Sequence, residues 1–208
     1  MEVEAPLAPG LAPGLRPEAR AFLLGQAEAP FLRLLGEGPL PSLGPRGTEA
    51  LALLLAHEAG LSGEALGEAL YGEPNPGALK ALLHRLREKG FRIACSPYRL
   101  ENPPPSDLRA FLRALSRGDL EEALALYQGP LLPWSQAPGV EELRLELEEA
   151  LRQAVLAQGD TENLFLLAER LGEDLEVWEA LLERLPSQDP RLPIVRARVA
   201  RLRREYGV

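Results

Sequence analysis

Basic side chains gather between residues 80 and 99 of a 208-residue chain whose net charge is −8. Ammonium and guanidinium groups bind phosphate oxygens, and arginine does so with a planar fork of donors. A local cluster of cations therefore indicates an anion-binding surface even in an acidic protein. The candidate phosphate-binding residues are Lys80, His84, Arg85, Arg87, Lys89, Arg92 and Arg99.

The sequence predicts that these residues lie on a helix and on the hairpin that follows it. Pro76 suits a first helical turn and Gly90 a helix end, so a helix is expected over 76–89. Two β-prone pieces flank "ACSP" within "FRIACSPYRLE" at 91–101, which predicts a hairpin. The helix should bury an apolar stripe and turn its cations outward, and that stripe consists of Leu79, Leu82, Leu83 and Leu86.

Two more helices are expected upstream of this pair. "TEALALLLAHEAG" predicts one that ends at Gly60, and Ser62 can cap the next, which Gly72 and Pro74 terminate. "FLRLLG" at 31–36 predicts a strand. Three helices followed by a basic hairpin is the order of a winged helix-turn-helix, whose last helix enters the major groove. The plainer alternative is a solvated face on a core helix.

The remainder of the chain is expected to be helical. "NPPPSD" at 102–107 predicts a stiff linker, because three prolines continue neither a strand nor a helix. Residues 1–30 are rich in Pro, Ala and Gly, which predicts a partly disordered extension with one short helix in "PEARAFLLGQAE". Gly or Pro separates six helical segments that form a repeat stack or a bundle, at 107–116, 119–128, 138–158, 161–171, 174–185 and 191–206.

Two stretches resemble known families. "LLHRLREKG" followed by "FRIACSPYRLE" resembles the recognition helix and wing of OmpR/PhoB-type winged helices, through Arg85-Leu86-Arg87 and Tyr98-Arg99-Leu100. "GDLEEALALYQGPLLPW" with "VEELRLELEEAL" resembles the tetratricopeptide-like bacterial transcriptional activation domain of the antibiotic-regulatory-protein family. The resemblance covers about residues 31–158. It implies a mainly α transcriptional activator, with a winged helix at 31–101, a linker at 102–106 and a helical domain at 107–208.

The same resemblance implies the partners. These are double-stranded DNA for the winged helix, and RNA polymerase or a second copy of the chain for the helical domain. Some residues depart from the family pattern: Gly77 and Ala78 stand where base-reading groups are usual, and Glu88 adds a negative charge. They favour the alternative of a protein–protein adaptor whose winged helix no longer reads DNA sequence.

Other chemistry finds little support in the sequence. His57 and His84 lie on different helices and suggest no metal pair, and Cys95 is expected to be a small turn residue. Because no phosphate-binding loop, nucleophile elbow or zinc pattern occurs, we expect neither an enzyme nor a cofactor. The carboxylates of 141–149 are expected on a solvated helix face, with an acidic partner-binding surface as the alternative. The arginines of 191–204 are expected to pair with acidic helices, notably 141–149.

The expected location is the cytoplasm. The chain has no long apolar run or signal peptide, and its single cysteine allows no internal disulfide. Abundant arginine and proline, with little methionine, suit a GC-rich genome or a thermophile.

Overall fold

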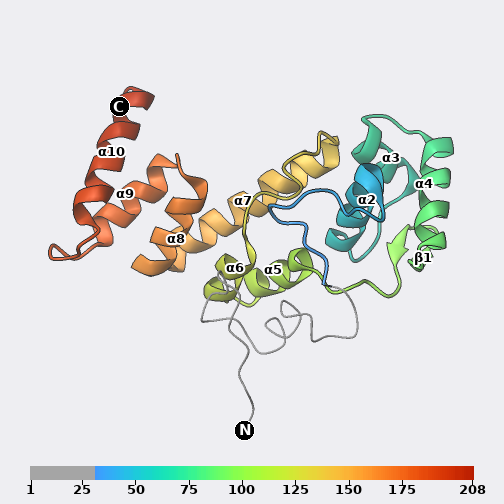
Figure 1. The fold of residues 1–208 in the computed structure, drawn as a ribbon, viewed down its shortest axis with the longest axis horizontal. Coiled ribbons are helices and arrows are strands. Elements are labelled where there is room, and N and C mark those ends of the chain that lie inside the picture. The colour runs from blue at the N-terminus through green and yellow to red at the C-terminus, as the bar shows by residue number, and fades with distance from the viewer. Residues whose placement is uncertain (1–30) are drawn as a thin grey trace, which may run out of the picture.

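The computed structural model describes residues 31–208 and is mainly helical, with two short strands (Figure 1). The extension and short helix expected over residues 1–30 lie outside the described residues. The elements are α2 (Gly44–Ala56), α3 (Gly63–Tyr71), α4 (Pro76–Glu88), β1 (Ile93–Ala94), β2 (Arg99–Leu100), α5 (Asp107–Ser116), α6 (Leu120–Leu126), α7 (Pro138–Gln158), α8 (Thr161–Leu171), α9 (Leu175–Arg184) and α10 (Leu192–Tyr206).

Helices α2, α3 and α4 pack on one another ahead of an antiparallel hairpin. Ser62 caps α3 by accepting from the Ala65 N–H, and Asn75 caps α4 by accepting from the Ala78 N–H. Strands β1 and β2 pair directly, and Tyr98 makes an isolated antiparallel bridge to Leu61 in the loop before α3. The hairpin is therefore tied to the helices at the start of α3.

The apolar stripe predicted on α4 is confirmed. Its four leucines are buried, whereas the residues on the opposite face are exposed. Helix α2 starts a few residues before its predicted start, because Pro45 fits a first turn whose N–H groups need no helical acceptor. The core of α2, α3 and α4 thus holds the cationic face of α4 outward.

Segment 31–36 is not the strand that the sequence predicted. It forms only two isolated bridges, from Leu32 to Ser106 and from Leu35 to Leu131. Its backbone partners come one at a time from different parts of the chain, so no continuous ladder develops. The segment consequently lies against the residues around α5 and the loop after α6.

The proline-rich stretch before α5 is in contact with this segment. The Leu32 N–H donates to the Pro105 carbonyl, and the Asp107 N–H donates to the Leu32 carbonyl, each over 3.0 Å. The buried Asp107 carboxylate accepts from the Leu34 and Leu35 N–H groups at 2.9–3.0 Å. Residues 31–36 and the start of α5 are therefore joined by hydrogen bonds.

The six helical segments predicted after residue 106 are confirmed, with ends that differ by a residue or two. Helices α5 and α6 pack as a pair, and α8, α9 and α10 pack in succession. The long helix α7 begins against α3, also contacts α2, and runs from there to α8, as Figure 1 shows. Its second residue, Gly139, lies directly against Ala69 of α3.

The arginines of 191–204 pair with carboxylates of other helices, as predicted, but not with those of 141–149, which corrects that part of the expectation. Arg191 pairs with Glu162 of α8, and Arg203 pairs with Glu179 of α9, each over 2.7 Å. Helix α10 packs on α9, so these neighbours are the carboxylates within reach. The stretch 141–149 lies on α7, and most of its carboxylates are exposed.

Over residues 31–208, no helix is both long and apolar enough to cross a lipid bilayer.

Candidate nucleic-acid interface

All seven of the side chains proposed to contact DNA are exposed. Lys80, His84, Arg85, Arg87 and Lys89 project from the outer face of α4 or its C-terminal end, because the leucine stripe fixes the rotation of this helix. The hairpin adjoining α4 carries Arg92 and Arg99. The structure thus brings the predicted residues onto one helix–hairpin unit.

Five of these cations have no partner. No other residue of 31–208 forms an ion pair or a side-chain hydrogen bond with them. An unpaired, solvated cation retains its full attraction for an external anion, because no neighbouring carboxylate neutralises it. The five are Lys80, Arg85, Lys89, Arg92 and Arg99.

Most arginines from α5 to the end of the chain already form ion pairs or hydrogen bonds within the protein. Arg152 pairs with Asp174 over 2.6 Å and also with Glu176. Arg144 donates to the backbone carbonyls of three residues of the α6–α7 loop, and Arg184 donates to two carbonyls near the end of α7. These guanidinium groups fasten helices and loops together. Apart from Arg87, the cations of α4 and the hairpin do not join one element to another in this way.

Arg87 links α4 to the hairpin. Its guanidinium donates to the Ile93 carbonyl, with N···O distances of 3.0 and 3.3 Å, and to the Cys95 sulfur at 3.2 Å. The sequence pattern assigned this arginine to DNA, and nothing in its local spacing distinguishes it from Arg85. Within the described chain, Arg87 holds the hairpin rather than standing free.

We expect Arg87→Ala to loosen the hairpin. Loss of the two hydrogen bonds to the Ile93 carbonyl and of the one to the Cys95 sulfur should cost about 1 kcal/mol, since the site is partly exposed. Hydrogen exchange of the amides of residues 91–100 should then accelerate. Arg85→Ala is the matched control, because Arg85 lies on the same helix without a partner. Equal exchange in the two variants would contradict a structural role for Arg87.

A carboxylate interrupts the cationic face. Glu88 lies 3.4 Å from the Nε2 atom of His84, one helical turn away, and both side chains are well exposed. At the start of the same face, Gly77 has open space around it and Ala78 offers no polar group. The face therefore offers many charges for phosphate but few groups that could read base edges.

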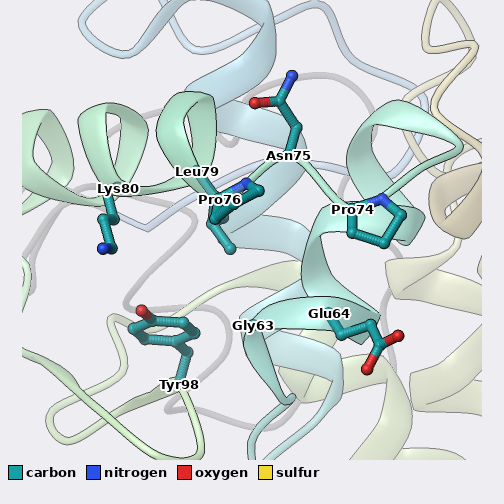
Figure 2. A pocket seen from close by; sticks show the side chains of 8 residues that line it. All are labelled: Gly63, Glu64, Pro74, Asn75, Pro76, Leu79, Lys80 and Tyr98. Carbon is teal, nitrogen blue, oxygen red and sulfur yellow. The ribbon is translucent and has the colours of Figure 1, made fainter.

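A pocket of about 270 Å³ lies beside this face, among the starts of α3 and α4 and the hairpin (Figure 2). Lys80 and Tyr98 both line it. In the sequence, Tyr98 stands out only as part of a family motif, and nothing indicates a cavity, since the lining residues come from three separate segments. The lining is Gly63, Glu64, Pro74, Asn75, Pro76, Leu79, Lys80 and Tyr98.

The other histidine and the cysteine have roles in local structure. His57 follows the last residue of α2, and its ring Nδ1 lies 2.8 Å from the Leu53 carbonyl oxygen, as expected for a capping residue. Cys95 is a free thiol in the exposed hairpin turn. No group of three His, Cys, Asp or Glu side chains within residues 31–208 is arranged to hold a metal ion.

Two comparisons relate this chain to known proteins. A family profile described as the third C-terminal helical domain of YTH3-like proteins matches residues 171–208, which contain α9 and α10. An uncharacterized 47.3 kDa protein in the thcA 5′ region of Rhodococcus erythropolis is 36% identical over 196 residues. That alignment covers 88% of this chain and 45% of the relative, so the chain spans less than half of the relative's length. Neither description refers to DNA or to a winged helix.

Proposed function

We propose that this chain is a cytoplasmic bacterial transcriptional activator that binds double-stranded DNA through α4 and the β1–β2 hairpin. In this proposal α2, α3, α4 and the hairpin form an OmpR/PhoB-like winged helix. The helices from α5 onward form a tetratricopeptide-like domain that contacts RNA polymerase or a second copy of the chain. The single observation that carries the proposal is the set of five unpaired cations on one helix–hairpin unit of an acidic protein.

Two structural features support the assignment of α4 as the DNA-facing helix. Its polar face is exposed, since the buried residues of α4 are the four leucines of the stripe. The hairpin is tied to the start of α3 and to Arg87, so its cations keep a fixed place beside α4. A helix and an adjoining hairpin held in this way suit the major groove and the neighbouring phosphates.

The test is DNA affinity across a salt series, with fluorescence anisotropy of labelled genomic fragments. If the five free cations all contact phosphates, the slope of log K against log salt should be about −4.5. Affinity should then fall roughly 10²- to 10³-fold between about 50 and 200 mM salt. Arg85→Glu combined with Arg92→Glu should abolish measurable binding, because each change replaces an attraction with a repulsion.

The matched control is Arg196→Glu combined with Arg204→Glu on α10. Both of these arginines are exposed and have no described partner, so the change in net charge is identical. We leave Arg87 unchanged in the test because its loss would disturb the hairpin itself. Equal DNA affinity of the two double variants at low salt would refute DNA binding by α4 and the hairpin.

One observation favours the second candidate function, a protein–protein adaptor. Glu88 lies within the cationic face, and the first turn of α4 presents Gly77 and Ala78 in place of polar groups. An adaptor of this kind would bind an acidic protein surface through the same cations. It would show salt-dependent binding to protein but none to DNA, so the anisotropy series distinguishes the two functions.

A further inference from the structure

The pocket beside Lys80 has the composition of a small-molecule site. Its walls are the rings of Pro74 and Pro76 and the side chain of Leu79, and the ring of Tyr98 lies across from them (Figure 2). Its volume of about 270 Å³ lies just below the range of ligand pockets, which begins at roughly 300 Å³. Such a space suits a ligand with one ring.

The polar groups of the pocket are arranged with opposite charges at opposite ends. Figure 2 shows the ammonium of Lys80 and the hydroxyl of Tyr98 toward one end, and the carboxylate of Glu64 toward the other. No other residue of 31–208 pairs with the Lys80 ammonium or bonds to the Tyr98 hydroxyl. Both groups can donate hydrogen bonds, and a carboxylate accepts from such donors. Glu64 repels an anion from the opposite end, which fixes one orientation.

We propose that this pocket binds a single-ring monocarboxylate. The carboxylate lies between Lys80 and Tyr98, and the ring packs against Pro76 and Leu79. Gly63 keeps the space open, because a Cβ atom there would lie 3.3 Å from the Tyr98 ring and crowd that wall.

Occupancy of the pocket also regulates DNA binding, and this second step rests on the proposed function. Lys80 is one of the five free cations, so a bound carboxylate neutralises a charge that would otherwise attract phosphate. The ligand and DNA then oppose each other. By thermodynamic linkage, DNA must weaken ligand affinity by the same factor by which the ligand weakens DNA affinity.

The first experiment titrates benzoate into the full chain without DNA, by ligand-observed NMR, beside benzyl alcohol as a neutral probe with the same ring. Benzoate should bind at a saturable site, and benzyl alcohol should bind at least fivefold more weakly. Lys80→Met and Tyr98→Phe should each weaken benzoate about three- to fivefold, as partly exposed donors do. Arg196→Met, which removes an unpaired charge from α10, should change nothing.

Three results would overturn the assignment: no saturable benzoate binding, equal affinity for both probes, or equal benzoate affinity in all the variants. Tyr98→Phe keeps the aromatic ring, and a wild-type far-UV spectrum with an unchanged unfolding midpoint shows that the fold is retained. The comparison therefore tests the hydroxyl alone.

The second experiment repeats the DNA titration in saturating benzoate. DNA affinity should fall about three- to tenfold, and Lys80→Met should abolish that effect. If benzoate binds but the chain binds no DNA, the proposed function fails while the pocket assignment stands. If both bind and DNA affinity stays unchanged, the regulatory coupling is wrong.

Discussion

Asp107→Asn should destabilise the protein by about 3 kcal/mol. The two oxygens of the buried Asp107 carboxylate accept from the backbone N–H groups of Leu34, Leu35 and Leu108 at 2.7–3.0 Å. Asparagine has one oxygen, and its amide N–H₂ would face at least one of these donors. Each buried N–H left unsatisfied costs about 1–3 kcal/mol. Urea unfolding followed by circular dichroism measures the difference.

The control for this change is Asp160→Asn at the start of α8. Asp160 is an exposed N-cap that accepts from the Asn163 N–H at 2.8 Å, and asparagine caps a helix as well as aspartate does. Its free energy of unfolding should change by less than about 0.5 kcal/mol. If Asp107→Asn lowered the free energy of unfolding by no more than this, the three hydrogen bonds to Asp107 would not be important for joining residues 31–36 to α5.

The cost of Asp107→Asn should also depend on pH. Burial raises the pKa of the Asp107 carboxyl above its ordinary value, although the three N–H donors act in the opposite direction. A raised pKa means that the folded state holds the proton more tightly than the unfolded chain. The stability that Asp107 contributes is therefore greatest below its unfolded pKa near 3.8 and is lost as pH rises through the folded pKa.

Asparagine does not titrate, so the gap in the free energy of unfolding between wild type and Asp107→Asn isolates this group. The gap should be larger at about pH 4 than at about pH 7, with all other carboxyls common to both proteins. A gap that grows as pH rises would show that the N–H donors outweigh burial.

The helices of this chain could be predicted because their signals are local. Pro76, Pro138 and Gly90 mark helix ends, and the leucine stripe of α4 fixes which face is buried. Neither signal depends on distant residues. Segment 31–36 was wrongly predicted as a strand, because its short apolar run could not show that its partners are single residues at positions 106 and 131.

In the candidate site, too, local features could be predicted and contacts between distant residues could not. Exposure of the cations follows from the helical period, so it was predictable. Whether a cation is free depends on neighbours in space, and Arg85 and Arg87 differ only in that respect. Asp107 appeared in the sequence as the end of a linker, whereas its partners Leu34 and Leu35 lie 73 and 72 residues away. A single sequence carries no signal for contacts of that separation.

Gly139→Ala should destabilise the protein by about 2 kcal/mol, which is the opposite sign to the usual effect of this change in a helix. A Cβ atom at Gly139 would overlap the Ala69 Cβ and lie 2.9 Å from the Ala69 Cα. These atoms cannot rotate away, so α7 must move off α3. Hydrogen exchange should then rise in α3 and in the first turns of α7, and thermal unfolding should occur at a lower temperature.

Gly77→Ala supplies a matched control, because Gly77 follows Pro76 at the start of α4 as Gly139 follows Pro138 at the start of α7. A Cβ atom at Gly77 meets nothing within 4 Å. Alanine should therefore be neutral or stabilising there by up to about 1 kcal/mol. The two substitutions share chemistry and helix position, so a difference in sign reports the α3–α7 contact alone. Helix α3 leads directly into α4, so the α3–α7 contact sets how rigidly the helices from α5 onward hold the cationic face of α4. Equal effects of the two substitutions would mean that these helices are only loosely joined to α2, α3 and α4.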